Sequence, residues 1–425
     1  MLNLLFASVL IRSEAPHELY DYLAIKDSSF HYEYRDRAKG EIEMTSQIWQ
    51  GRPWKHTILM RQPSRLQTHG TAILFITGDG PFKGDYSDLG LITEATGMPT
   101  AMLFDIPNQP IYGMKEDDLI AHTFEEYLST GDATWPLLFP MTKSAIRAMD
   151  AVVALTKGTE NPIHNFVVTG ASKRGWTTWF VGASKDKRVK AIAPMVIDNL
   201  NVPRQMKHQM DSWGAYSEEI QDYTRRGLQA KLATPQGQRL GLIVDPYSYR
   251  SNITMPTLIV KGANDPYWTV DALSQYWDDL HQPKWAVTVP NAGHDLGNKI
   301  EAIESIGAFA RSIAGDFRMP KQSWSLEEIP GDKRALKVSL DSNGPKLVKL
   351  AVWVAEADNL DFRKSTYKVA GALKIDGAKP GVSRPSIIVP IAADHNVAVF
   401  AEARYLVGRR QFSLCCPTQV FKKLN

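Results

Sequence analysis

The chain has 425 residues, 44% of them hydrophobic, so it can bury a large core and is long enough for two or three domains. Its 49 basic and 46 acidic residues leave a formal charge of +3, without a long basic run or an acidic tail, which argues against a nucleic-acid-binding protein. The two cysteines, Cys415 and Cys416, are adjacent, which suits neither an ordinary disulfide nor a zinc site. We therefore expect no disulfide framework, no metal and no cofactor.

The amino terminus leaves two interpretations open. Residues 2–11 (LNLLFASVLI) are apolar, but no positive charge precedes them and the following RSEAP is only a partial cleavage site. Ten or so apolar residues are too few to span a bilayer, and no other stretch approaches a transmembrane length. Residues 1–18 therefore form either the remnant of a secretory signal or a short N-terminal segment, and the protein is either exported or cytoplasmic.

The next part of the chain predicts an α/β domain over residues 19–318. Three alternating stretches, residues 31–37, 41–49 and 54–61, are typical of antiparallel strands. After them, buried strands and helical stretches follow one another. Apolar strands are expected at 71–80, 100–107, 165–171, 189–198, 257–260 and 285–290, with helices at 141–155, 270–280 and 300–313. This alternation predicts a mostly parallel sheet with helices on both faces.

Two further regions differ from this pattern. About fifty residues, 199–250, are polar, aromatic and helical in texture, and they interrupt the α/β alternation where a cap would cover a site at the sheet edge. From residue 319 to 425, short alternating strands are separated by Gly, Pro, Asp and Asn. We expect a helical cap insertion in the first region and a separate all-β sandwich domain in the second.

Residues 165–179 (NFVVTGASKRGWTTW) have the outline of a nucleophile elbow. An apolar run breaks at Gly170, presents Ser172, and continues as a helix that opens with small residues. In an α/β-hydrolase, such a turn exposes the serine hydroxyl beside backbone N–H groups. Arg174 stands where the G-x-S-x-G pattern has its second glycine, and Gly175 follows one place later. Taken alone, this stretch is also consistent with an ordinary strand-to-helix turn that has no catalytic role.

An acid and a base follow in the chain order of this fold. The strand at 257–260 leads into KGANDPYW, which places Asp265 just beyond its carboxyl end, and the strand at 285–290 leads into NAGH, which places His294 likewise. All three side chains thus leave the carboxyl edge of the predicted sheet, where ligands bind in open α/β folds. We predict that Ser172 is the nucleophile, His294 its base, and Asp265 the group that orients the histidine.

Each member of this triad has a plainer alternative. Asp265 can be a turn or helix-capping residue, and His294 can be a loop histidine bound to backbone. Asp198, at the end of the strand after the elbow, is the rival acid, because some hydrolases take their carboxylate from that strand. We favour Asp265.

The residues around the serine suggest an oxyanion hole and a pocket. One oxyanion donor is expected from the backbone N–H of Lys173 and the other from the loop around Asp79 and Gly80. Tyr267 and Trp268, beside the acid, are expected to line the substrate pocket. For Lys173 and Arg174 two interpretations stay open: a cation that meets an anionic part of the substrate, or, as we favour for Arg174, a hydrogen-bond network with a nearby carboxylate.

Several segments resemble the PhoPQ-activated pathogenicity-related protein family of bacteria and some protists. They are SKRGWTTW (172–179), IPNQP (106–110), TGDATWPLLFPMTKSAIRAMD (130–150), DPYSYR (245–250), SQYWDDL (274–280) and VPNAGH (289–294). The resemblance runs from about residue 20 to the end of the β-rich region. It implies an α/β-hydrolase fold with the serine, acid and histidine at Ser172, Asp265 and His294, but no particular substrate. Asn264 departs from the family pattern, where glycine precedes the acid.

The sequence therefore predicts a serine hydrolase that cleaves an ester or amide of a small molecule or peptide through an acyl-enzyme. An aminopeptidase-like or other peptidase is one alternative. A non-catalytic binding or signalling protein on the same scaffold is another, because fold does not fix function. A Ser172 hydroxyl sealed under residues 199–250, without contact to His294, would favour that last interpretation. The sequence gives no oligomeric state.

Overall fold

The computed structural model describes residues 15–423 except 67, 330–332, 342–343, 375–381, 384–385 and 391–394. Of the predicted signal segment, residues 1–14 lie outside the described residues. The first described helix, α1, spans Glu18–Ala24. No helix among the described residues is long and apolar enough to cross a membrane.

The α/β part is built on a mixed sheet. Its strands in chain order are β1 (His31–Asp36), β2 (Glu41–Trp49), β3 (Arg52–Arg61), β4 (Thr71–Ile76), β5 (Thr100–Leu103), β6 (Asn165–Ala171), β7 (Val189–Met195), β8 (Thr257–Gly262) and β9 (Lys284–Val289). They lie in the spatial order β1-β2-β3-β5-β4-β6-β7-β8-β9. Pairing is antiparallel from β1 to β5 and parallel from β5 through β9. This is an α/β-hydrolase-like sheet with parallel core strands, as predicted.

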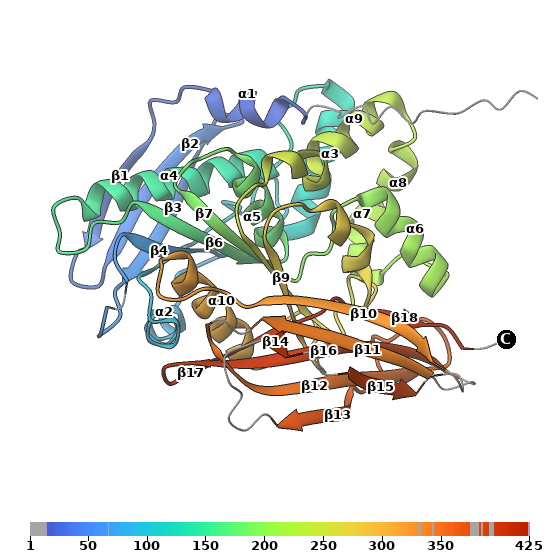
Figure 1. The fold of residues 1–425 in the computed structure, drawn as a ribbon. Coiled ribbons are helices and arrows are strands. Elements are labelled where there is room, and N and C mark those ends of the chain that lie inside the picture. Colours follow the sequence, from blue (N-terminus) through green and yellow to red (C-terminus); the bar gives the residue numbers. More distant parts are fainter. Residues whose placement is uncertain are drawn as a thin grey trace, which may run out of the picture.

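Helices cover both faces of this sheet (Figure 1). They are α2 (Lys83–Thr96), α3 (Glu116–Thr130), α4 (Leu138–Thr156), α5 (Lys173–Ala183) and α10 (Ile300–Ile313). α4 and α5 share one buried core with the strands, and α10 lies in a second core on the other side. The predicted helix at 270–280 is instead two short 3-10 turns, Ala272–Gln275 and Trp277–Asp279.

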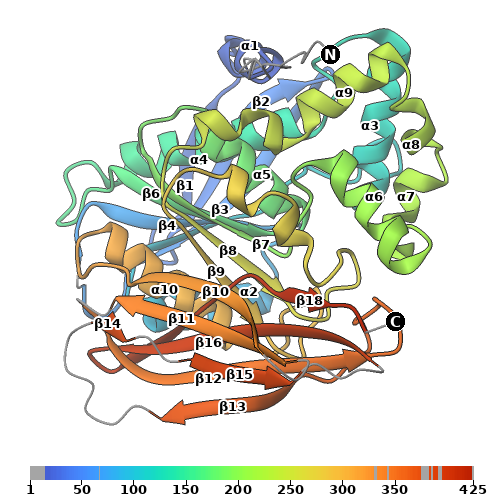
Figure 2. The ribbon, with the colours of Figure 1, turned by 45° about the vertical axis from the view of Figure 1, so that its right-hand side comes forward.

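Residues 199–250 are helical, as predicted. They form α6 (Val202–Trp213), a 3-10 turn (Glu218–Ile220), α7 (Gln221–Thr224), α8 (Leu228–Lys231), α9 (Pro235–Val244) and a further 3-10 turn (Pro246–Asn252). Figures 1 and 2 show α6 to α9 gathered beside α3 on one side of the sheet.

The C-terminal region is all-β, but the prediction of a separate sandwich is corrected. Its strands are β10 (Lys321–Ile329), β11 (Lys333–Asp341), β12 (Lys346–Ala357), β13 (Lys368–Lys374), β14 (Val382–Ser383), β15 (Ser386–Pro390), β16 (Asn396–Val407), β17 (Arg410–Cys415) and β18 (Gln419–Phe421). β17 pairs antiparallel with β9 at Cys415 and Ala286, so β17, β16, β12, β13 and β18 extend the central sheet to 14 strands. β10, β11, β14 and β15 form a second, four-stranded sheet.

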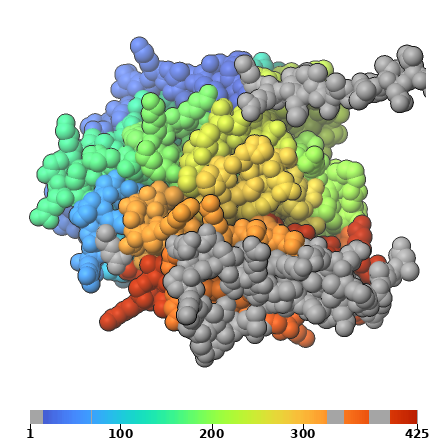
Figure 3. All heavy atoms as spheres, in the orientation of Figure 1, coloured from blue at the N-terminus to red at the C-terminus, as the bar shows by residue number. Residues whose placement is uncertain are grey.

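This continuity has a physical reason. β9 would otherwise be an exposed edge strand of the parallel sheet, and β17 covers that edge. The packing is continuous as well, because one buried core contains Val287 of β9, Phe309 of α10, and Phe400 and Leu414 of the C-terminal strands. The space-filling view shows the two parts in direct contact (Figure 3).

His56 of β3 is a buried polar residue that holds the first strands to the loop after β5. Its Nδ1 lies 3.2 Å from the carbonyl oxygen of Phe104 and 3.1 Å from that of Asp105. A carbonyl only accepts, so Nδ1 carries the proton and Nε2 accepts from the Ser46 hydroxyl at 2.9 Å. Burial lowers the pKa of His56 from 6.5 to about 4, so the imidazole is neutral at neutral pH.

This shift predicts acid sensitivity. As the pH falls below 6.5, the unfolded chain takes up a proton on His56 before the folded chain does, so the stabilisation present above pH 6.5 is lost as the pH falls through about 4. Urea denaturation at neutral pH and near pH 4 should show the free energy of unfolding falling by roughly 3 kcal/mol more in the wild type than in His56→Gln. Parallel losses in the two proteins would contradict this role.

Candidate active site

Ser172 lies on a sharp turn between β6 and α5. Its φ of 57° and ψ of −126° place a non-glycine residue in a left-handed region that side chains disfavour. Two hydrogen bonds hold it there: its N–H donates to the carbonyl of Met195 at 3.0 Å, and its carbonyl accepts from the N–H of Trp176 at 2.9 Å. Strain of this kind is typical of a nucleophile elbow, in which the side chain projects from the turn.

Two glycines make the turn possible. A Cβ on Gly170 would lie 2.7 Å from the carbonyl oxygen of Arg174, and one on Gly175 would lie 2.7 Å from both Met195 O and Ile197 Cγ2. Gly175 is thus required for close packing of α5 against the end of β7. The glycine that the usual motif places at 174 therefore stands one residue later here, with Arg174 in its place.

Asp265 and His294 meet at the carboxyl ends of β8 and β9. His294 Nδ1 lies 3.1 and 3.0 Å from the two carboxylate oxygens of Asp265, which also accepts from the N–H of Tyr267 at 3.0 Å. Because a carboxylate accepts, Nδ1 carries the proton and Nε2 is the basic nitrogen. The ring of Tyr267 stacks on His294 with a centroid distance of 4.2 Å, which fixes the plane of the imidazole.

The loops that carry these two residues are fastened to the C-terminal region. A Cβ on Gly262 would lie 2.2 Å from the carbonyl of Gly293, so glycine lets the two loops touch. Asn264 Nδ2 donates to the carbonyls of residues 362, 363 and 365 at 3.0, 3.3 and 2.8 Å. Asn291 exchanges two hydrogen bonds with the backbone of Tyr367, at 3.0 and 2.7 Å. The asparagine that departs from the family pattern therefore ties the acid loop to the loop between β12 and β13.

Asp198, the rival acid, has other partners. It is 2% exposed, accepts from the Tyr276 hydroxyl at 2.6 Å, and lies 3.0 Å from the ammonium of Lys261, which is buried as well. No hydrogen bond or ion pair joins it to His294 within the described chain. Its geometry is that of a buried ion pair.

Lys173 and Arg174 both face carboxylates at the start of α3. Arg174 forms a bidentate pair with Glu116 at 2.7 and 2.6 Å and donates from Nε to the carbonyl of Ile106 at 2.5 Å. The Lys173 ammonium lies 2.7 Å from Glu116 and 3.1 Å from Asp117. Although burial opposes it, this pairing lowers the pKa of Glu116 to about 2. Arg174 thus lies in a network with a nearby carboxylate.

The predicted oxyanion donors lie in different places. The backbone N–H of Lys173 opens α5 directly after Ser172, and no other group in the described chain accepts from it. Asp79 instead binds Lys115 and Gln109 at 2.9 and 2.8 Å, and the Gly80 N–H points to Asp105 at 3.4 Å. Neither Asp79 nor Gly80 lines the cavity at Ser172.

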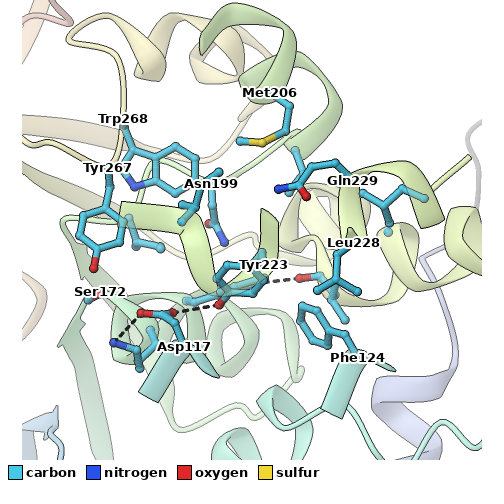
Figure 4. Close-up of a pocket in the computed structure, with 18 of the residues that line it drawn as sticks. Asp117, Phe124, Ser172, Asn199, Met206, Tyr223, Leu228, Gln229, Tyr267 and Trp268 are labelled. Atoms are coloured by element: carbon cyan, nitrogen blue, oxygen red, sulfur yellow. Dashed lines mark hydrogen bonds and ion pairs between the residues drawn. The ribbon is translucent and has the colours of Figure 1, made fainter. Parts of the chain in front are cut away.

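That cavity has a volume of about 120 Å³ and is shared by Ser172 and His294. Of the residues expected in a substrate pocket, Tyr267 and Trp268 line this cavity and Arg174 does not. Figure 4 shows Tyr267 and Trp268 on one side of the cavity, with Phe124 and Leu228 on the other. Its remaining walls come from α3, α5 and residues 197–244: Asp117, Lys173, Trp176, Ile197, Asn199, Val202, Met206, Ile220, Tyr223, Gln229, Leu232, Leu240, Gly241 and Val244.

No hydrogen bond joins the side chains of Ser172 and His294 in the described chain. Ser172 is half-buried, and His294 Nε2 is buried without a hydrogen-bond partner in the described chain. Nucleophile–base hydrogen bonds are often long or misaligned before substrate binds. No group of three or more His, Cys, Asp or Glu residues that could hold a metal is found within the described ranges.

Residues 19–363 match the sequence model of the PhoPQ-activated pathogenicity-related proteins. The chain belongs to this family. The match ends before β13, short of the C-terminal end that the resemblance suggested. Autocrine proliferation repressor protein A of Dictyostelium discoideum is 32% identical over 379 residues, which cover 81% of this chain and 76% of that protein.

Solved structures similar to this member of the family include two bacterial esterases. The acetyl xylan esterase from Paenibacillus sp. R4 has 14% identity and a TM-score of 0.46, covering 68% of this chain and 95% of its own. Acetyl xylan esterase 1 from Thermoanaerobacterium sp. JW/SL YS485 has the same identity and TM-score, with coverages of 69% and 95%. Likenesses this distant say nothing about the chemistry of the site.

The sequence analysis did not predict the roles of four residues of the site. Glu116 and Asp117 pair with the two cations after the serine, and Asn264 and Asn291 fasten the loops. The KEDD run at 115–118 begins a helix after a turn, where acidic residues favour the helix dipole, so its charge has an ordinary local explanation. The unusual Asn264 before the acid was the one usable signal.

Proposed function

We propose that this protein is a serine hydrolase that cleaves an ester or amide through an acyl-enzyme intermediate. The observation that carries the proposal is the convergence of three loops. Ser172 stands on a strained strand-to-helix turn, and it shares a cavity with His294, whose Nδ1 is held by the buried carboxylate of Asp265.

Each side chain then has a defined role. Ser172 Oγ attacks the carbonyl carbon while His294 Nε2 takes its proton, and Asp265 stabilises the imidazolium. The Lys173 N–H donates to the oxyanion. As the bond to the leaving group breaks, His294 returns the proton to that group. Water then attacks the acyl-enzyme, again with His294 as base, and the free acid leaves with Ser172 restored.

The domain arrangement is part of the proposal. We assign residues 19–318 to the hydrolase domain, 199–250 to its cap, and 319–425 to a β-rich domain joined to it through β9 and β17. The cap assignment is supported by the cavity, because α6, α8 and α9 supply much of the wall above Ser172.

A fluorophosphonate probe tests this proposal, because such probes phosphonylate a serine that a neighbouring base activates. We expect one equivalent of adduct per chain in the wild type and none in Ser172→Ala. Adduct formation that persists in the folded alanine variant would contradict it.

A non-catalytic signalling protein is the second candidate. It is favoured by the name of the Dictyostelium relative, an autocrine proliferation repressor, and by the missing hydrogen bond between Ser172 and His294. The same probe separates the two candidates, because a site without an activated serine stays unlabelled.

A further inference from the structure

The cavity beside Ser172 has the size and lining of a site for one apolar group. Its walls include Phe124, Trp176, Met206, Leu228, Leu240 and Val244. A cavity of about 150 Å³ with similar lining is large enough for benzene. The volume of about 120 Å³ here therefore suits a branched or short aliphatic side chain rather than a long acyl chain.

The charged residues of this cavity are already paired with each other. One carboxylate oxygen of Asp117 accepts from the Tyr223 hydroxyl at 2.9 Å, and the other lies 3.1 Å from the Lys173 ammonium (Figure 4). Lys173 also binds Glu116, which is held by Arg174. Asp117 and Lys173 thus balance each other at the cavity wall, and Glu116 and Arg174 continue the network behind it. A free ammonium on the substrate would have to displace Lys173 or Tyr223 to reach a carboxylate.

Besides His294, two polar side chains of the cavity are unsatisfied. Asn199 Nδ2 and Oδ1 and the indole N–H of Trp268 are buried, and within the described chain none of them has a hydrogen-bond partner. Both residues line the cavity, where Figure 4 labels them. Most buried polar groups have hydrogen-bond partners, so unpartnered groups in the wall of a cavity are available to a ligand.

The chemistry of these groups identifies their ligand. Asn199 offers an NH2 group that donates and a carbonyl oxygen that accepts, and Trp268 offers one N–H donor. A hydrocarbon satisfies none of them and a lone carbonyl cannot satisfy the Asn199 oxygen, whereas a secondary amide presents both a carbonyl and an N–H. We propose that the acyl part of the substrate is an N-acylated apolar amino acid, an inference that rests on the proposed function. Its side chain would lie in the cavity, and its amide would form hydrogen bonds with Asn199 and Trp268.

Three p-nitrophenyl esters that share one side chain test this inference. They are the esters of N-acetyl-leucine, of 4-methylpentanoic acid, which lacks the amide, and of leucine with a free ammonium below neutral pH. With each kcat/KM divided by the spontaneous hydrolysis rate, the N-acetyl-leucine ester is expected to exceed both others by about tenfold or more, because unpaired polar groups reject analogues that lack their partner.

Substitutions locate the effect. Asn199→Leu and Trp268→Phe should each reduce the advantage of N-acetyl-leucine over 4-methylpentanoate by roughly tenfold. Neither should unfold the chain, because each removes an unsatisfied buried group. Met206→Trp, which fills the cavity, should slow hydrolysis of both the N-acetyl-leucine and the 4-methylpentanoate esters. Met210→Trp is the matched control, because Met210 is 42% exposed on the same helix.

The outcomes separate this inference from the proposed function. Ser172-dependent hydrolysis with equal rates for the three esters, a preference for the free ammonium, or an unchanged advantage in both Asn199→Leu and Trp268→Phe would overturn the inference alone. An unlabelled Ser172 together with no turnover of any ester would overturn both.

Discussion

Ser172→Ala is expected to lower kcat/KM for an activated ester by about 10⁴-fold or more. Alanine keeps the Cβ and the backbone of the elbow but removes the atom that forms the acyl bond. Thermal unfolding should change little, since Ser172 is held by its backbone groups, not by its hydroxyl.

The control for this variant lies at the other end of the same helix. Ser184 follows α5, and its hydroxyl donates to the carbonyl of Val181 at 2.7 Å. Ser184→Ala should retain full activity with a loss in stability of about 1 kcal/mol. Turnover by Ser172→Ala within tenfold of the wild type would show that another group is the nucleophile.

Asp265→Asn and Asp198→Asn are expected to fail in different ways. The asparagine amide at 265 would donate where the carboxylate accepted, which favours the wrong tautomer of His294. We expect kcat to fall by about 10³- to 10⁴-fold, with stability close to that of the wild type.

Asp198→Asn is expected to lower the stability of the fold rather than kcat. It leaves the buried ammonium of Lys261 without its counter-charge, and breaking a buried ion pair in this way costs about 3 kcal/mol. Urea denaturation would measure the loss, and kcat per folded molecule should stay within a few-fold of the wild type. A large loss of kcat in Asp198→Asn alone, with Asp265→Asn active, would make Asp198 the catalytic acid.

The local parts of this molecule could be predicted from sequence because each has a local cause. A strand followed by a glycine-flanked serine, and two strands whose following loops carry Asp265 and His294, predict that these side chains lie at the same edge of the sheet. The prediction that residues 199–250 are helical is confirmed for the same reason, because helix formation is largely local. The roles of these residues stay a prediction.

The long-range parts could not be predicted, because they depend on which surfaces meet. Nothing in the strand pattern after residue 319 says that β17 would pair with β9 and extend the central sheet. The ion pairs of Lys173 and Arg174 join residues about sixty positions apart in the chain. In the sequence, Asn199 is only the first residue of the predicted insertion. Its place in the wall of the cavity, with side-chain atoms that lack hydrogen-bond partners, depends on the tertiary structure.

The central claim is that Ser172 is an activated nucleophile, and the position of a fluorophosphonate adduct tests it most directly. Trypsin should release residues 158–173 as one peptide, because Lys157 and Lys173 bound it. The account predicts that tandem mass spectrometry places the adduct on Ser172, and that denaturing the protein or substituting His294→Gln beforehand abolishes it. An adduct on another residue, or an unmodified Ser172 in the folded wild-type protein, would contradict the account.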